Sequence, residues 1–173
     1  MSIADTTVYW STCHVNDWQM YVAKTERGIC YIGSPNHPFA ELEAWIKKKI
    51  PTAALVESDT LLQEEVTELK QYILGERDTF TVDFDLIGTD FQQAVWQASA
   101  NIPYGETKTY SEIAEQIGRP KAVRAVGTAI GANPLLVIIP CHRIVAKDGG
   151  LAGFRAGIDM KKFLLQLENK NKE

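Results

Sequence analysis

Charge divides the chain into two halves of opposite sign. Residues 1–88 hold 7 lysines and arginines against 14 aspartates and glutamates, whereas residues 89–173 hold 11 against 8. The charge balance is therefore −7 in the first half and +3 in the second, although the whole chain of 173 residues carries −4. Because only the second half would attract a polyanion, this pattern predicts two domains, 1–88 and 89–173, of which the second approaches nucleic acid.

Composition places the chain among ordinary globular proteins. It is 45% hydrophobic and 23% charged, which excludes the disordered and low-complexity classes. The longest apolar run, residues 135–139, is too short to cross a membrane, and the first eight residues lack a basic start followed by an apolar stretch. The three cysteines (Cys13, Cys30 and Cys141) suit free thiols in a reducing compartment. We therefore expect a cytoplasmic protein with no membrane partner.

The first half has the pattern of a small α/β domain. Alternating or compact apolar patterns predict strands at residues 7–15, 18–24, 29–32 and 80–86. Helical spacing predicts one helix between Pro38 and Pro51 and another between Leu62 and Gly75. This half contains no motif that indicates chemistry, and we place its boundary at Gly88-Thr89.

The second half is mainly helical and contains a predicted helix-turn-helix. Thr89 caps a first helix, and Thr109 forms a capping box with Glu112 at the start of another. That helix should stop at Gly118, and Arg119-Pro120 should begin the next one, with the proline in its first turn. Two short helices joined by a tight glycine turn are typical of a helix-turn-helix.

The second helix of this pair has an unusual outer face. A helical wheel places the apolar residues on one side and these residues on the other: Lys121, Arg124, Gly127, Thr128 and Gly131. Each glycine costs about 1 kcal/mol of helix propensity, so the face favours close approach of another backbone. Arg124 would then be placed to enter a groove or a base stack. The alternative is a helical hairpin packed in a core, with Arg124 solvated.

A buried run leads to one distinctive cysteine. Asn133-Pro134 ends the helix, and the apolar residues 135–139 then deliver Pro140-Cys141-His142-Arg143 to the edge of the core. A nucleophilic thiol needs a nearby base or positive charge, which His142 and Arg143 offer. Because adjacent side chains of an extended segment point to opposite faces, His142 would act through a water or a tight turn.

Cys13 and Cys30 are expected to be inert buried residues. A zinc site built from Cys13, Cys30, His14 and His37 is the alternative, but these spacings match no compact metal pattern. We therefore predict no metal site.

The segment Pro140-Cys141-His142-Arg143-Ile144-Val145 resembles the signature of the O6-alkylguanine-DNA alkyltransferases, the methylated-DNA–protein-cysteine methyltransferases. The resemblance continues in register over most of residues 89–168. It includes these segments: Pro103-Tyr104-Gly105-Glu106, Thr109-Tyr110, Ala122 to Gly127, Asn133-Pro134, Gly149-Gly150-Leu151, Gly153-Phe154, Gly157 and Phe163-Leu164-Leu165 to Glu168. The first half matches only in its length and α/β character.

The resemblance implies both a fold and an activity. The fold would be α/β, with a small N-terminal ribonuclease H-like domain and a mainly helical C-terminal domain of the winged helix-turn-helix kind. The activity would be DNA repair by single-turnover transfer of an alkyl group from O6-alkylguanine, and usually O4-alkylthymine, in double-stranded DNA to Cys141. The damaged nucleotide would be flipped through the minor groove. No cofactor is implied, and the protein would be a monomer that could bind DNA cooperatively.

The resemblance also implies residue roles. His142 and Glu168 would draw the thiol proton through a water, Tyr110 would donate to the base and crowd the phosphate, and Arg124 would fill the vacated stack. Arg143 would be structural. The DNA-binding face would further include Ala122, Gly127, Thr128 and Gly131. The substrate pocket would be formed by Asn133, as a hinge, with Val145, Gly150, Leu151, Phe154 and Arg155.

Two positions depart from the family pattern. Arg155 stands where some members have a small hydroxyl residue that helps to bind the base oxygen, and Phe154 stands where tyrosine is frequent. Acceptance of adducts bulkier than methyl is therefore left open by the sequence.

Three other functions remain open at this point. A non-catalytic lesion binder of the alkyltransferase-like type would lack the nucleophile, but Cys141 is present. A cysteine hydrolase would need turnover and an oxyanion site, for which no motif exists. A transcription factor would use the helix-turn-helix but would not explain the buried run that ends at a cysteine.

Overall fold

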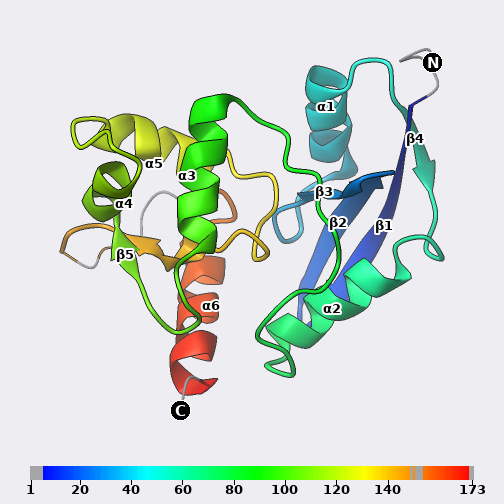
Figure 1. The fold of residues 1–173 in the computed structure, drawn as a ribbon. Coiled ribbons are helices and arrows are strands. Elements are labelled where there is room, and N and C mark those ends of the chain that lie inside the picture. The colour runs from blue at the N-terminus through cyan, green and yellow to red at the C-terminus, as the bar shows by residue number, and fades with distance from the viewer. Residues whose placement is uncertain (1–5, 149, 151–153, 172–173) are drawn as a thin grey trace. The chain divides into compact units, whose positions relative to one another are not determined.

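The computed structural model describes residues 6–148, 150 and 154–171. The chain forms two compact units, Met1–Ile87 and Gly88–Glu173, which are described separately (Figure 1).

The first unit is built on a four-stranded sheet of order β3-β2-β1-β4 (Figure 1). Its strands are β1 (Thr7–Val15), β2 (Trp18–Thr25), β3 (Gly28–Ile32) and β4 (Ala54–Glu57), and its helices are α1 (Phe39–Lys49) and α2 (Gln63–Ile73). The first three strands are antiparallel neighbours, and β4 runs parallel to β1. Leu42 and Ile46 of α1 pack with Val8, Ala23 and Tyr31 of the sheet in a buried core. The predicted α/β character of this half is confirmed.

The predicted strand at residues 80–86 is wrong. The segment makes only an isolated bridge, between Phe84 and Ile29, and Phe84 is 47% exposed. Before this bridge, the carboxylate of Glu68 accepts hydrogen bonds from the backbone N–H groups of Thr81 (2.8 Å) and Val82 (3.4 Å). The Glu68 carboxylate thus binds backbone N–H groups that, in a strand, would donate to the carbonyls of a neighbouring strand. The prediction also missed β4, which is short and mostly exposed.

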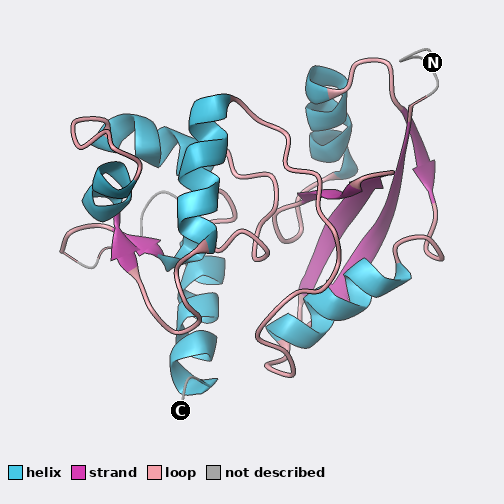
Figure 2. Ribbon diagram, viewed as in Figure 1, coloured by secondary structure: helices cyan, strands magenta, loops and turns pink. Residues whose placement is uncertain are grey.

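The second unit consists mainly of helices (Figure 2). Its helices are α3 (Asp90–Ala100), α4 (Tyr110–Gln116), α5 (Val123–Gly131) and α6 (Ile158–Asn171), with a short 3-10 helix, η2 (Cys141–Arg143). Two-residue strands β5 (Lys108–Thr109) and β6 (Ile144–Val145) pair in parallel. Because η2 runs directly into β6, this pairing joins the segment that carries the cysteine to the start of α4.

Capping is as predicted at two helices. Thr89 and Gln92 form a complete capping box on α3, and Thr109 and Glu112 form one on α4. Gly118 adopts a φ of +77°, the left-handed conformation that a glycine accepts after a helix.

The predicted start of the following helix at Arg119-Pro120 is wrong. The backbone N–H of Ala122 donates to the carbonyl of Arg119 (2.9 Å), which closes a tight turn. Helix α5 begins only at Val123, and the first helical bond at its start runs from the N–H of Val126 to the carbonyl of Ala122. Pro120 therefore lies in the turn before α5 and not in its first turn.

Candidate active site

The apolar run is buried as predicted, but it delivers Cys141 into the interior and not to the edge of the core, because Cys141 is 0% exposed. Leu135, Val137 and Ile139 are buried, and the buried side chain of Asn133 braces the loop. Its Nδ2 donates to the carbonyl of Ile139 (3.0 Å), and its Oδ1 accepts from the N–H of Leu135 (2.9 Å). The loop then closes into η2, the tight turn that the sequence left as one option for placing His142.

The Cys141 thiol is fully buried and neutral in the free protein. Its exposed fraction is 0%, and its Sγ–H donates to Ser99 Oγ at 3.9 Å. Burial raises the pKa of Cys141 to about 12, while hydrogen bonds with Ser99 and Asn133 and the charges of Lys161 and Arg155 oppose this rise. A reaction at this sulfur therefore requires a base that removes its proton.

A buried network lies directly after the cysteine. His142 Nε2 is 2.6 Å from Glu168 Oε2, and Arg143 Nε donates to Glu168 Oε1 at 2.7 Å. Arg143 also donates to the carbonyl of Ile102. Since a carboxylate held by an arginine only accepts, His142 carries its proton on Nε2. Burial lowers the pKa of His142 more than Glu168 raises it, so the imidazole is neutral.

The second ring nitrogen of His142 is an available acceptor. His142 Nδ1 is buried, and within the described part of the chain it has no hydrogen-bond partner. A neutral imidazole with Nε2 protonated leaves Nδ1 as the basic nitrogen. No direct hydrogen bond between His142 and Cys141 is present among the described residues.

Lys161 is a site residue that the sequence reading missed. It is fully buried on α6, its Nζ donates to the carbonyl of Ile144 at 2.5 Å, and its ammonium lies 5.9 Å from the Tyr110 ring centroid. Burial lowers the pKa of Lys161 to about 8. The signal was available, because Lys161, Leu164 and Glu168 share one helical face and all three are buried.

The predicted DNA-binding residues gather on α4 and α5. Arg124 and Thr128 are exposed on α5, while Ala122 at its N-cap and Gly131 at its last turn are half-buried. A Cβ built on Gly131 meets no described atom within 4 Å, and one on Gly127 only touches the Tyr110 ring, at 4.0 Å. The glycines are thus not explained by packing within the described chain, which disfavours the core-hairpin alternative.

The predicted pocket residues take different positions. Phe154 is buried with its ring 6.2 Å from that of His142, and Val145 is half-buried on β6. Arg155 is half-buried, and its Nε donates to the carbonyl of Asn133 at 2.8 Å. Gly150 lies in a turn that Asp148 closes. Leu151 is outside the described residues.

Comparison with known proteins follows the same division into two parts. Residues 90–170 match the family model of the 6-O-methylguanine DNA methyltransferase DNA-binding domain, and residues 8–86 match that of its ribonuclease-like domain. An inducible methylated-DNA–protein-cysteine methyltransferase of Bacillus subtilis is 49% identical over 164 residues, which cover 95% of this chain and 92% of the relative. The chain belongs to this family.

Solved structures of methyltransferases of this family have the same fold. The O6-methylguanine methyltransferase of Mycobacterium tuberculosis superimposes with a TM-score of 0.80 at 36% identity, covering 95% of this chain and 94% of that one. The same bacterial protein in complex with DNA gives a TM-score of 0.76 at 34% identity, with the same coverage. These matches confirm the resemblance inferred from the cysteine signature and the predicted pairing of a ribonuclease-like domain with a DNA-binding domain.

The alternative zinc site, whose candidate ligands all lie in the first unit, finds no support. Among the described residues, no group of three or more histidines, cysteines, aspartates or glutamates could hold a metal ion. Cys13 and Cys30 are buried, and burial raises their pKa values to about 11 and about 12. His37 instead lies 2.5 Å from Glu41, one helical turn away.

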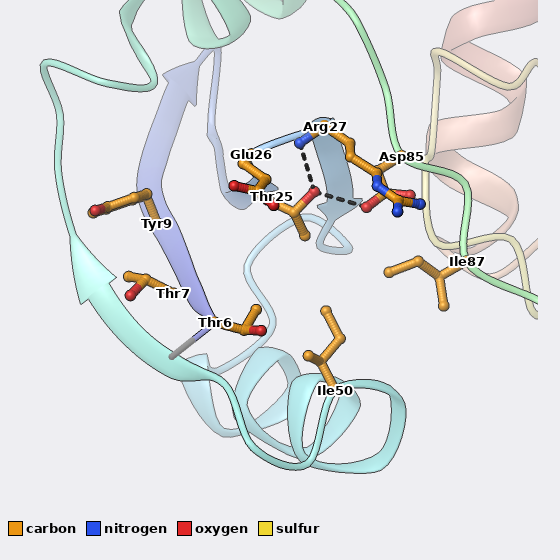
Figure 3. A pocket seen from close by; sticks show the side chains of 9 residues that line it. All are labelled: Thr6, Thr7, Tyr9, Thr25, Glu26, Arg27, Ile50, Asp85 and Ile87. Carbon is orange, nitrogen blue, oxygen red and sulfur yellow. Dashed lines mark hydrogen bonds between the residues drawn. The ribbon is translucent and has the colours of Figure 1, made fainter. Parts of the chain in front are cut away.

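The ribonuclease-like unit contains a cavity of about 610 Å³ with a mixed polar and apolar lining (Figure 3). Its lining residues are Thr6, Thr7, Tyr9, Thr25, Glu26, Arg27, Ile50, Asp85 and Ile87. The hydroxyl of Thr25 donates to Asp85 at 2.7 Å and accepts from the N–H of Arg27, which stabilises the turn at this edge of the sheet. The lining contains no cysteine or histidine that could act as a nucleophile or base.

None of the helices in the described ranges is long and apolar enough to cross a membrane.

Proposed function

We propose that this protein repairs alkylated DNA by moving the alkyl group from O6 of guanine, or O4 of thymine, to Sγ of Cys141. The sulfur–carbon bond forms as the oxygen–carbon bond breaks, and the proton lost by the thiol replaces the alkyl group on the base. The product is a thioether with no evident leaving chemistry, so one molecule repairs one lesion. The observation that carries this proposal is a buried Cys141 followed directly by the hydrogen-bonded His142–Glu168 pair.

The catalytic roles follow from the protonation of this pair. Glu168 keeps the proton of His142 on Nε2, which leaves Nδ1 to receive the thiol proton through a bridging water. Tyr110 donates to the flipped base, and its hydroxyl stays protonated because burial raises its pKa. The alkylated base brings the group to be transferred, so the reaction needs no cofactor.

The DNA-binding role falls on the helix-turn-helix formed by α4 and α5. The smooth face at Gly127, Thr128 and Gly131 lets a DNA backbone approach the helix, and Arg124 enters the minor groove to fill the place of the flipped nucleotide. We assign the base pocket to Val145, Gly150, Leu151, Phe154 and Arg155, with Asn133 as the hinge. Because the thiol is fully buried in the free protein, the flipped base has to open this pocket to reach it.

We further infer a cytoplasmic monomer whose partner is double-stranded DNA. Three free cysteines suit a reducing compartment. Sedimentation with and without a long duplex tests both the monomer and cooperative binding.

Intact mass after incubation with a duplex that contains O6-methylguanine tests the reaction. We expect one added methyl group, mapped to Cys141, with no further gain when more duplex is added. Cys141→Ser should gain nothing, whereas Cys13→Ser and Cys30→Ser should gain one methyl group each. An unchanged mass despite tight binding would indicate a non-catalytic lesion binder, and repeated turnover would indicate a hydrolase.

Substitution of Arg124 tests its proposed role in flipping the nucleotide. Arg124→Ala should slow repair of the duplex at least tenfold but leave the reaction with free O6-methylguanine base unchanged, because only the duplex contains a stack to fill. Lys121→Ala is the matched control, an exposed basic residue in the turn before the same helix. Equal losses on duplex and free base would contradict the role of Arg124.

A further inference from the structure

Ser99 is a buried hydroxyl that contacts the reactive sulfur. It lies in the last turn of α3 with 0% exposure, and its Oγ is 3.9 Å from Cys141 Sγ, although the two residues are 42 positions apart. The same Oγ lies 2.8 Å from the carbonyl oxygen of Val95, one helical turn earlier. The signature around Cys141 gives no hint of this contact.

Counting protons settles the direction of both hydrogen bonds. A serine hydroxyl has one proton, and a carbonyl oxygen can only accept. The proton of Ser99 therefore points to Val95, and Ser99 Oγ accepts the proton of the Cys141 thiol. In the free protein Ser99 thus accepts a hydrogen bond from the neutral thiol, whose pKa burial raises.

Ionisation of the Cys141 thiol reverses the direction of its hydrogen bond with Ser99. A thiolate can only accept, and hydrogen bonds to an ionised partner are about twice as strong as neutral ones. The hydroxyl proton of Ser99 reaches the sulfur by rotation about the Cβ–Oγ bond, without displacing any heavy atom. The carbonyl of Val95 still accepts the helical N–H of Ser99, so the rotation leaves no buried group unsatisfied.

We propose that Ser99 is a further catalytic group of the alkyl transfer, whose hydroxyl turns from Val95 to Cys141 as the thiol loses its proton. This inference rests on the proposed function, because it assigns Ser99 to the ionisation step of that reaction. The rotated hydroxyl stabilises the thiolate until the sulfur attacks the alkyl carbon. Afterwards the thioether has no charge, and the hydroxyl returns to Val95.

Asn133 also hydrogen-bonds to the sulfur, but both it and Lys161 donate to backbone carbonyls as well. Asn133 Nδ2 donates to the carbonyls of Leu135 and Ile139, and Lys161 Nζ donates to the carbonyl of Ile144. Lys161 and Arg155 lower the pKa of Cys141 through their charges, and the hydrogen bond to Ser99 is the largest influence in that direction. Burial and, to a smaller extent, the charge of the Cys141 thiolate raise the pKa of Tyr110 on α4.

Single-turnover repair of an O6-methylguanine duplex between pH 6.5 and 9 tests this role. Ser99→Ala should react about tenfold more slowly and reach the wild-type rate only about one pH unit higher, since one pKa unit is a tenfold change in thiolate. The dissociation constant for the duplex should stay within twofold. A merely structural role would instead weaken binding or leave the pH profile in place.

Ser99→Thr and Ser99→Val form a matched pair, because the two side chains have nearly the same shape and only threonine has a hydroxyl. A threonine hydroxyl also bonds to the carbonyl four residues earlier in a helix. We expect Ser99→Thr to stay within threefold of the wild type and Ser99→Val to be about tenfold slower than Ser99→Thr. Equal rates for this pair would overturn the proposal.

Alkylation of Cys141 by iodoacetamide without DNA separates this inference from the proposed function. The rate of alkylation at Cys141, followed by peptide mass, should be about tenfold lower in Ser99→Ala than in the wild type. It should also be about tenfold lower in Ser99→Val than in Ser99→Thr. Failure of the wild type to accept a methyl group from DNA would overturn the proposed function, yet this comparison would still decide the effect of Ser99 on the thiol. Identical iodoacetamide rates in all variants would overturn the role of Ser99.

Discussion

Glu168 allows two basic side chains to be buried beside the nucleophile. Its carboxylate, 1% exposed, contacts His142 Nε2 at 2.6 Å and Arg143 Nε at 2.7 Å. A buried guanidinium without a counter-charge would be strongly unfavourable. One residue therefore both fixes the protonation of His142 and neutralises Arg143.

Replacing this carboxylate by an amide should reduce stability. Glu168→Gln removes the carboxylate that neutralises the buried Arg143, and we expect the free energy of unfolding to fall by about 3 kcal/mol. Urea unfolding at neutral pH measures this loss. Glu115→Gln, an exposed position on α4, should change the free energy by less than about 0.5 kcal/mol. Equal effects of the two substitutions would contradict the interpretation.

Cys30 should make the protein less stable at alkaline pH. Burial, with a smaller effect of Asp85, raises the pKa of this thiol from 9.0 to about 12. The folded state binds the proton more tightly, so the stabilisation is complete below pH 9 and is lost as the pH rises from 9 towards 12. By pH 10.5 the loss through Cys30 should be about 2 kcal/mol.

Removing the thiol should flatten this dependence. We expect Cys30→Ala to lower the free energy of unfolding by about 1 kcal/mol at pH 7, because it leaves a small cavity, but to reduce the further decline between pH 9 and 10.5. Urea unfolding at pH 7, 9 and 10.5 measures both effects. Parallel curves for wild type and variant would show that Cys30 does not titrate as expected.

At the scale of elements, α5 has two faces with opposite requirements. Val126, Ala129 and Ile130 are buried, while the outer face has glycines at positions 127 and 131. Glycine is a poor helix former, and space for a larger side chain exists at both positions. The outer face of α5 is therefore not optimised for the stability of the helix.

Adding a single methyl group at Gly127 should have opposite effects on stability and on DNA binding. Gly127→Ala should raise the free energy of unfolding by up to about 1 kcal/mol, because the new Cβ meets only the Tyr110 ring at 4.0 Å and alanine favours the helix. The same methyl group should weaken duplex binding, because it obstructs the approach of the DNA backbone. Thermal unfolding and fluorescence anisotropy measure the two effects. Lower stability, or unchanged duplex affinity, would refute this account of the glycine face.

At the scale of the whole molecule, charge is concentrated by domain. The balance of −7 in residues 1–88 and +3 in residues 89–173 means that the net charge of −4 conceals a basic DNA-binding domain. Binding through lysines and arginines releases counterions from the duplex, so it weakens as salt rises.

Duplex affinity should therefore fall at least about tenfold between 50 and 200 mM KCl, with a linear dependence of log affinity on log salt concentration. Anisotropy titrations of the full-length protein measure the slope. The rate of Cys141 alkylation by iodoacetamide without DNA should be insensitive to salt over the same range, which controls for changes in the protein itself. A salt-independent duplex affinity would contradict electrostatic binding.

The sequence by itself determined the features that depend on residues close together in the chain. The capping boxes at Thr89 and Thr109, the turn glycine at Gly118 and the buried run that ends at Cys141 each depend on a few neighbouring positions. Periodicity likewise predicted the three antiparallel strands and both helices of the first unit. The pairing of His142 with Glu168 came from the family signature and not from any local pattern.

The tertiary structure decided the contacts between distant segments. Ser99 meets Cys141 across 42 positions, Arg143 bonds to the carbonyl of Ile102 across 41, and Lys161 reaches the carbonyl of Ile144 across 17. The alternating pattern at residues 80–86 indicated a strand, yet Glu68, 13 positions before Thr81, binds its backbone donors instead. Apolar periodicity shows which side of a segment is buried, but only the fold determines which polar groups meet there.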